Sequence, residues 1–572
     1  IGVDTETTGI DPWLSKVLII TMGNGNQQYV YDVARLEPQQ IQELKKILEN
    51  PNKLKILQNA KFDYKALKAD MGIELNNVYD TMLVEQVITR GKKSAGSSLA
   101  DLAEKYVGIT LPKEVRSTFS TMQFGDSLSQ EQMEYAARDV QYLGDIMTAQ
   151  LKAVKKYKLE KVIDLENKVV LATGDMELSG IYLDAKKWVG LAELAIAERE
   201  KAAKILDDHF IPVVGVDLLG NADINYNSPQ QLTAALNQFL THPITSTKEE
   251  YLKSINHPVI KALLDYREKQ KQFSTYGSAF LKYIHPTTKR IHPDFLQVMG
   301  TDSGRYSCQN PNLQNLPAMF EYREPFCAQL LDWRIVGADY SGMELRLLAE
   351  LSMDPGFLEI FDKGLDPHAT VGSMLYGKPI RAPGTNGPND LGENMDLRRN
   401  AKTLNFGVAY GMGSKRLAAA TGMDYTQAKK LIAEFWKKFP KVKEFFDTMI
   451  EHAITNECAI SPLDGRIRWL KDVDFDDIKS RVHAENIAKN FPLQGGNASI
   501  TKLALVLIRE QIKGKQIKII NTIHDEILLE AHETCANDAK QILETCMINA
   551  AKPYIKRVPI TVESYISTHW KK

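Results

Sequence analysis

Cysteine is scarce in this chain of 572 residues, which has five cysteines and no C-x-x-C pair. That pattern argues against a zinc ribbon or a disulfide framework and suits a reducing compartment. The sequence also lacks an apolar run near the roughly 18 residues that cross a bilayer, and it has no visible signal peptide. We therefore expect a cytoplasmic protein that does not bind membranes, and an organelle would fit the same features.

Neither sign of charge is in excess, because 71 basic and 72 acidic residues give a net charge of −1. The whole-chain charge therefore says nothing about nucleic acid. The basic residues are nevertheless clustered: residues 398–416 contain five of them and no acid, and residues 428–443 contain six lysines and one glutamate. Such stripes are typical of a nucleic-acid channel, although a solvated helix face produces the same pattern.

Strand and helix patterns alternate over residues 1–150, which predicts an α/β layer arrangement. The expected strands are 1–3, 17–22 and 28–33, and the expected helices are 38–49, 64–71, 99–106 and 129–152. Because the chain starts inside a predicted strand, we expect the natural protein to begin earlier.

The rest of the chain is mainly helical in pattern. Helices are expected at 160–205 with an interruption at 180–184, at 228–240, at 258–284, and from 343 to 457; strands are expected at 290–298 and 333–339. A Gly-, Pro- and Asn-rich loop at 381–396 interrupts the last helical block. It is either a partner site or, as we favour, a tolerated surface insertion.

An acidic set lies within the first 140 residues. Asp4 and Glu6 are two apart on a predicted strand and so face the same side, where they repel each other unless a cation neutralises them. Asp63 and Asp139, on predicted helices, would complete four oxygen ligands, which suit Mg²⁺ or Mn²⁺ better than zinc. Two such ions about 4 Å apart activate water for phosphodiester cleavage. Tyr135, one turn before Asp139, is placed to position that water.

A second acidic pair is predicted near the C-terminus. Two β-rich runs, 516–523 and 527–530, flank His524-Asp525-Glu526 and predict a hairpin with Asp525 and Glu526 at its apex, followed by a helix over 535–550. Asp339 ends another predicted strand. Paired carboxylates at strand ends are what a two-metal site for nucleotide addition needs.

A regular spacing marks one helix between these carboxylates. Arg398, Lys402, Phe406 and Tyr410 recur every four residues and wind slowly around one broad helix face of roughly 18 Å. The two cations suit a triphosphate, and the two rings can stack on a sugar and base. Lys402 can also give a proton to departing pyrophosphate. A core helix with solvated cations has the same spacing, but the match to both halves of one ligand favours a nucleotide.

The motifs D-T-E-T, N-x-x-F-D and Y-x-x-x-D, in this order, resemble the DEDDy family of 3′–5′ exonucleases. The resemblance implies metal ligation by the four acids and water orientation by the tyrosine; these residues are Asp4, Glu6, Asp63, Asp139 and Tyr135. It also implies that Ile10 and Asn59 contact the 3′-terminal nucleotide.

The sequences around Asp339, Arg398–Tyr410 and His524–Glu526 resemble the motifs of family A DNA polymerases with the Klenow-fragment architecture. The resemblance implies catalysis by Asp339, Asp525, Glu526 and Lys402, and metal ligation by Asp339, Tyr340 and Asp525. The implied nucleotide-binding residues are Arg398, Lys402, Phe406, Tyr410, His368 and Glu344, with Glu344 as a steric gate against a ribose 2′-hydroxyl. The implied DNA contacts are Arg305, Asn312, Gln314, Asn490, Gln494 and His524. Because some relatives carry Tyr in place of Phe406, Phe406→Tyr is expected to raise dideoxynucleotide uptake.

The resemblance covers nearly the whole chain. It implies an α/β exonuclease domain with a ribonuclease H-like mixed sheet at 1–155, then an α+β right-hand polymerase domain at 156–572. The implied subdomains are a thumb at about 190–290, a palm at about 291–350 and 458–572, and fingers at about 351–457. Gly342 and the run Asn400–Thr403 have a phage character, which would place the protein in a host cytoplasm.

The expected activity is template-directed DNA synthesis with 3′–5′ proofreading. The alternatives are a 3′–5′ exonuclease whose polymerase half binds DNA but synthesises weakly, and a non-catalytic nucleic-acid scaffold. The implied cofactor is Mg²⁺, two ions in each site, with Mn²⁺ able to substitute. The expected partners of a monomer are primer-template DNA and dNTPs, and further candidates are a processivity factor or a helicase/primase.

Overall fold

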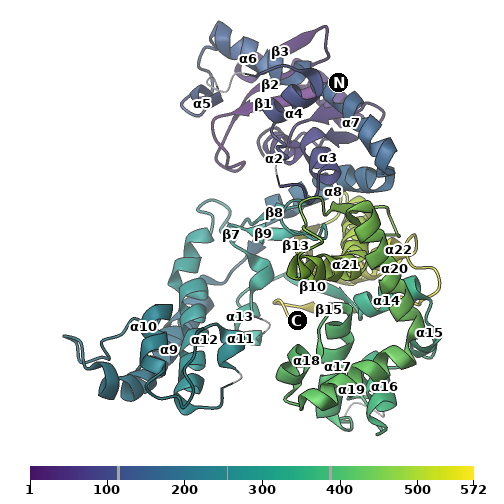
Figure 1. Ribbon diagram of the computed structural model, residues 1–572. Coiled ribbons are helices and arrows are strands. Elements are labelled where there is room, and N and C mark those ends of the chain that lie inside the picture. The colour runs from purple at the N-terminus through teal and green to yellow at the C-terminus, as the bar shows by residue number, and fades with distance from the viewer. Residues whose placement is uncertain (94, 112–115, 254, 318, 386–389, 572) are drawn as a thin grey trace. The chain divides into compact units, whose positions relative to one another are not determined.

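The computed structural model describes residues 1–93, 95–111, 116–253, 255–317, 319–385 and 390–571 (Figure 1). The chain divides into two compact units. The larger unit contains Ile1–Ile181, His292–Asn315 and Leu330–Thr568, and the smaller contains Tyr182–Ile291, Leu316–Gln329 and His569–Lys572. Among the described residues, no helix combines the length and the apolar character needed to cross a membrane.

A five-stranded mixed sheet organises the start of the larger unit, in the order β3-β2-β1-β4-β5. The strands are β1 (Gly2–Thr7), β2 (Val17–Gly23), β3 (Gln28–Asp32), β4 (Lys55–Leu57) and β5 (Val78–Asp80). The first three pair antiparallel, and β4 pairs parallel with β1 and β5. Every residue of β2 is buried, as expected for an inner strand.

Helices pack against this sheet. They are α1 (Pro38–Glu49), α2 (Ala60–Met71), α3 (Thr81–Ile88), α4 (Leu99–Val107), α5 (Arg116–Phe119), α6 (Gln130–Gln141) and α7 (Leu143–Tyr157). Helix α6 contacts β1, β2 and β3, and α2 contacts β1, β2 and β5. Both helices are thereby brought beside β1, which is the strand with the first two predicted ligands.

The sequence predicted most of these elements. The bounds of α1 agree with the prediction, and α2 begins four residues earlier than expected. The single helix predicted over 129–152 is wrong: Tyr142, with φ −101° and ψ −1°, separates α6 from α7. The short strands β4 and β5 were missed because three buried residues are too few to show a period.

A four-stranded antiparallel sheet, in the order β13-β14-β10-β15, organises the C-terminal part of the larger unit. Its strands are β10 (Trp333–Tyr340), β13 (Ile517–Ile523), β14 (Glu526–His532) and β15 (Val562–Ser567). The predicted hairpin is therefore confirmed, although Glu526 is the first residue of β14 and not part of the turn. Helices α8 (Glu160–Ser179) and α22 (Ala536–Ala551) pack against this sheet, and α21 (Ile478–Gln511) packs against both helices.

Within its described residues, the predicted helical block contains seven helices. They are α14 (Met343–Ser352), α15 (Pro355–Asp362), α16 (Pro367–Tyr376), α17 (Met395–Ala409), α18 (Ser414–Thr421), α19 (Tyr425–Lys438) and α20 (Pro440–Asn456). Asp354 and Asp366 cap α15 and α16, each followed by Pro at the first turn. In the predicted loop 381–396, Arg381 and Glu393 form an isolated β-bridge and α17 begins at Met395; residues 386–389 lie outside the described part.

The described part of the larger unit also contains two short ribbons: β8 (Asp294–Leu296) pairs with β9 (Ser307–Gln309), and β11 (Cys458–Ile460) pairs with β12 (Ile467–Trp469). The smaller unit contains α9 (Ala185–Val214), α10 (Pro229–Leu236), α11 (Glu249–Leu252) and α12 (Pro258–Tyr276), which enclose an apolar core of their own. The helix predicted over 258–284 is α-helical only to Tyr276; a 3₁₀ helix, Ser278–Tyr283, follows.

Candidate active sites

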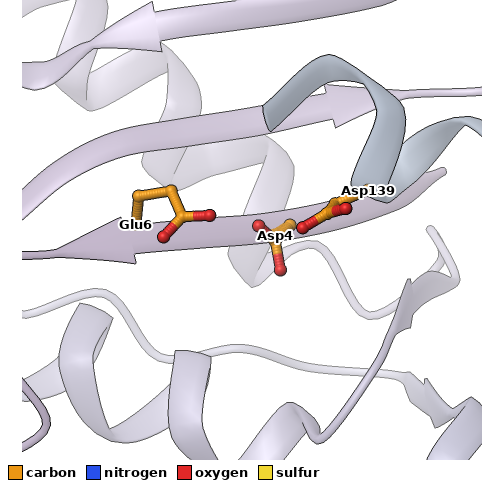
Figure 2. A group of neighbouring side chains, drawn as sticks. All are labelled: Asp4, Glu6 and Asp139. Carbon is orange, nitrogen blue, oxygen red and sulfur yellow. The ribbon is translucent and has the colours of Figure 1, made fainter. Parts of the chain in front are cut away.

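The carboxylates of Asp4, Glu6 and Asp139 converge, with one oxygen of each lying within 4.8 Å of the other two (Figure 2). Asp4 and Glu6 come from β1, and Asp139 comes from α6. Three carboxylates this close repel one another, and a divalent cation relieves that repulsion. An oxygen-only donor set of this kind fits Mg²⁺ or Mn²⁺.

Asp63, the fourth predicted ligand, borders this group without joining it. It lies on α2 as predicted and is 2% exposed. Its Oδ1 accepts hydrogen bonds from Thr5 N at 2.9 Å and Thr5 Oγ1 at 2.7 Å. Burial raises the pKa of Asp63 to about 7, and the Thr5 hydrogen bonds oppose that rise. Since Thr5 lies between Asp4 and Glu6 on β1, these bonds fix α2 beside the three converging carboxylates.

The other residues predicted for this site lie around it. Tyr135 is one turn before Asp139 on α6; burial, and then the charges of Asp139 and Glu6, raise its pKa, so its hydroxyl keeps its proton. Asn59 precedes α2 with a left-handed backbone (φ 65°). Ile10 is 88% exposed and lines a small pocket with Phe62. The side chain of Ile10 is therefore accessible to a ligand at this pocket.

The second acidic pair lies on the four-stranded sheet. Asp339 of β10 pairs across the ladder with Glu526, and Asp525 is in the adjacent turn after His524, which has a left-handed backbone (φ 55°). Burial, followed by the charge of Asp339, raises the pKa of Asp525 to about 7. The structure thus brings Asp339 and Asp525 into electrostatic contact, although they are far apart in sequence.

Two residues next to this pair, Glu526 and Tyr340, have side chains that form hydrogen bonds within the protein. Glu526 is 5% exposed and accepts a hydrogen bond from the Tyr565 hydroxyl at 3.1 Å. The Tyr340 hydroxyl donates to the carbonyl oxygen of Met547 at 2.7 Å, and Tyr340 is 2% exposed. The Tyr340 side chain is therefore turned away, which leaves its backbone carbonyl as the atom that could ligate a metal.

Two of the nucleotide-binding residues predicted on α17, Arg398 and Phe406, contact the start of α16. Arg398 pairs with Asp366, with 2.6 Å between Nη2 and Oδ2. The rings of His368 and Phe406 lie 5.4 Å apart. Burial, and then the positive charges of Arg398 and Lys402, lower the pKa of His368 to about 4, although Asp366 opposes them. His368 is therefore neutral near pH 7.

Glu344 joins the predicted DNA contact to this helix, because both Arg305 and Tyr410 donate hydrogen bonds to its carboxylate. Tyr410 was predicted on the helical face, but α17 ends at Ala409 and Tyr410 is its C-terminal cap. Burial and then Glu344 raise the pKa of Tyr410, and Gln494 of α21 also hydrogen-bonds to it. Arg305, Glu344 and Gln494 therefore meet around one tyrosine hydroxyl.

The remaining predicted DNA contacts are more dispersed. Asn490 lies one turn before Gln494 on α21, and its buried Oδ1 has no hydrogen-bond partner among the residues that the structure describes. Asn312 Oδ1 accepts a hydrogen bond from Gln314 N at 3.0 Å, and both His524 and Asn312 are exposed.

Two residues that contact the predicted nucleotide-binding side chains of α16 and α17 were not predicted from the sequence. Asp366 holds Arg398, and the Asn405 side chain has its Nδ2 3.1 Å from His368 Nδ1. An Asp-Pro pair is the usual start of a helix, so Asp366 was recognisable as a cap. Its second role as the partner of Arg398 depends on a contact between two helices, which no local pattern predicts.

Comparison with known proteins supports the two sites independently of their geometry. The family model for DNA polymerase family A matches residues 214–572. The chain belongs to DNA polymerase family A. A second model, described as 3′–5′ exonuclease, matches residues 1–155. The predicted fold class, an exonuclease domain followed by a family A polymerase domain, is therefore confirmed. Both kinds of domain generally use divalent metal ions, in agreement with the carboxylate groups.

Its relatives include proteins named DNA polymerase I from Borreliella burgdorferi and from Pseudomonas aeruginosa, each 30% identical over an alignment that covers 100% of this chain. The chain spans 62% and 63% of their lengths, respectively. A solved structure of the POL domain of Pol1 from M. smegmatis, in complex with DNA primer-template and dNTP, matches with a TM-score of 0.84 and 25% identity. That match covers 100% of this chain and 95% of the other.

Proposed function

We propose that this chain is a DNA-directed DNA polymerase that extends a primer 3′ end on a template and removes nucleotides from that end at a separate 3′–5′ exonuclease site. The observation that carries this proposal is the presence of two distinct carboxylate groups, one around Asp4 and one around Asp339. Near the second group, Glu344 of α14 accepts hydrogen bonds from Arg305 and from Tyr410 at the end of α17. The family membership and the relatives named DNA polymerase I support the same activity.

At the exonuclease site, Asp4, Glu6, Asp139 and Asp63 would hold two Mg²⁺ ions. Rotation of the Asp63 carboxyl away from Thr5 would bring it into the group. The Tyr135 hydroxyl orients the attacking water, and Asn59 and Ile10 hold the terminal nucleotide. When bound, the cations would make that water more acidic and neutralise the leaving oxygen.

At the polymerase site, Asp339, Asp525 and the Tyr340 carbonyl would hold the second pair of Mg²⁺ ions. Lys402 is exposed on α17 and can cancel charge on the triphosphate and protonate the departing pyrophosphate. Arg398 reaches the same phosphates by exchanging Asp366 for them. Neutral His368 can donate one hydrogen bond without adding charge.

Selection of the nucleotide would depend on the side chains around Tyr410. Phe406 supplies a stacking surface, and Glu344, held by Arg305 and Tyr410, occupies the position of a ribose 2′-hydroxyl. Arg305 and Gln494, with Asn490, His524, Asn312 and Gln314, would contact the primer-template.

The finer organisation belongs to the same proposal. We assign an exonuclease domain to 1–155 and a polymerase domain to 156–572, with the thumb, palm and fingers predicted from the sequence. Mn²⁺ is expected to substitute for Mg²⁺. A monomeric state, a host-cytoplasm location, a phage origin and a processivity factor or helicase/primase partner remain predictions.

A single assay tests the function. A 5′-labelled primer-template is incubated with the protein and Mg²⁺, with and without dNTPs. We expect extension with dNTPs and shortening without them. Shortening under both conditions would instead support an exonuclease with a DNA-binding polymerase half, and no change under either would support a non-catalytic scaffold.

A further inference from the structure

Helix α2 presents two chemically different faces. One face turns Asp63 toward Thr5 of β1, beside the converging carboxylates. Lys61, Lys65 and Lys68 recur at intervals of four and three residues and so share another face of the same helix. Whatever holds this lysine face also sets the orientation of Asp63.

Glu177, near the end of α8, binds two of these lysines at once. Lys61 Nζ lies 2.7 Å from its Oε1, and Lys65 Nζ lies 2.6 Å from its Oε2. The backbone N of Phe295 also donates to Oε1 at 2.7 Å. The Glu177 side chain is only 3% exposed, so water contributes little screening of these bonds. Its carboxylate therefore fixes two successive turns of α2.

The lysine face has further partners in the same region. Lys61 also pairs with Asp294 of β8 at 2.9 Å, and the pKa of Lys61 is raised because Glu177 and Asp294 together outweigh its burial. Lys68 pairs with Asp175 at 2.7 Å, and also with Glu74 at 2.8 Å. The helix is therefore held along its length and not at a single point.

Tyr64 adds a neutral contact next to Asp63. Its hydroxyl donates to Asp175 Oδ1 at 2.5 Å, and Arg509 of α21 binds the other oxygen of Asp175 at 2.6 Å. The Tyr64 ring lies against Gly174, where an added Cβ would come within 2.5 Å of Tyr64 Cδ1. Glycine at this position lets α2 approach α8 closely.

The acidic partners on α8 and β8 are Asp175, Glu177 and Asp294, and all three lie outside residues 1–155, which the exonuclease family model matches. We propose that Glu177 is a positioning residue for the exonuclease reaction: it holds the lysine face of α2 and thereby sets Asp63 against the other metal ligands. This inference rests on the proposed exonuclease function. Because a shift of about 1 Å in a catalytic group can cost about 100-fold in rate, loss of this contact should be measurable.

The test uses the full chain with Glu177→Gln, which keeps the shape of the side chain and removes its charge. We expect the kcat of primer trimming to fall at least about tenfold and the Mg²⁺ concentration for half-maximal trimming to rise. KM for DNA and the rate of primer extension should stay within about twofold of wild type, because the catalytic residues of the polymerase site are unchanged.

Three further variants sharpen the test. Glu177→Asp, which keeps the charge, should recover part of the trimming rate. Lys65→Met, which removes one of the two paired lysines, should cause a smaller loss than Glu177→Gln. Asp164→Asn is the matched control, because Asp164 is also on α8 but forms an exposed pair with Lys168; it should trim and extend like wild type.

The outcomes separate this inference from the function on which it rests. If wild type trims primers and Glu177→Gln trims equally well, the positioning role is refuted and the exonuclease function stands. If wild type does not trim, the proposed function fails first. A parallel loss of trimming and extension, with a lower thermal midpoint, would show a general structural role and would also refute the inference.

Discussion

His368 is a partly buried titratable residue near two cations, and its protonation state should affect stability. Burial, Arg398 and Lys402 lower its pKa to about 4 from an ordinary value of 6.5. Asn405 Nδ2 lies 3.1 Å from His368 Nδ1, which can accept that hydrogen bond only when it is deprotonated. The unfolded chain therefore binds the proton first as the pH falls.

This residue predicts a specific pH dependence. The stabilising contribution of neutral His368 is complete above pH 6.5 and is lost as the pH falls toward 4. The loss is at most about 3 kcal/mol in the free energy of unfolding. Thermal midpoints of wild type and His368→Gln, measured from pH 4 to 7.5, should show a steeper decline for wild type below pH 6.5. Parallel curves would contradict the lowered pKa.

At the scale of elements, β10 carries Asp339, and its Gly337 provides space for a ring from β15. A Cβ at Gly337 would come within 2.3 Å of Tyr565 Cζ. The same tyrosine donates to Glu526 Oε1 at 3.1 Å. Gly337 therefore lets Tyr565 lie across β10 and hold the first residue of β14, directly after Asp525.

We predict that Gly337→Ala displaces Tyr565 and breaks its bond to Glu526. The free energy of unfolding should fall by about 1–2 kcal/mol, and primer extension should slow several-fold while trimming is unchanged. Tyr565→Phe is the matched control, because it keeps the ring and loses only the hydrogen bond, and it should have a smaller effect on both measurements. Extension at the wild-type rate in Gly337→Ala would refute this reading of β10.

Sequence patterns predicted the elements whose conformation depends on residues that are close together in the chain. The start of α10 beside Ser228 and the hairpin around Asp525 agree with the structure because they depend on neighbouring residues. The break at Tyr142 was missed because the apolar period continues through it. The bond between Asp63 and Thr5 and the contacts of Glu177 with α2 were also missed, since they join residues 58 and more than 110 positions apart.

Across the whole molecule, the two carboxylate groups share no residue and lie on different sheets. Asp4, Glu6 and Asp139 belong to the mixed sheet and α6, whereas Asp339 and Asp525 belong to the antiparallel sheet. If each group holds its own cations, the two proposed reactions, which have opposite outcomes on the same primer end, can therefore be removed one at a time.

We predict that Asp4→Ala with Glu6→Ala lowers trimming at least about a hundredfold and leaves extension within about twofold, because it removes ligands from one group only. Asp525→Asn should do the reverse. The matched control is Glu160→Ala with Asp164→Ala, two exposed acids on α8, which should alter neither activity. Single-turnover assays with and without dNTPs measure both rates. If either catalytic variant abolished both activities while its thermal midpoint stayed at the wild-type value, the two groups would belong to one coupled site, and the assignment of separate synthetic and proofreading centres would be wrong.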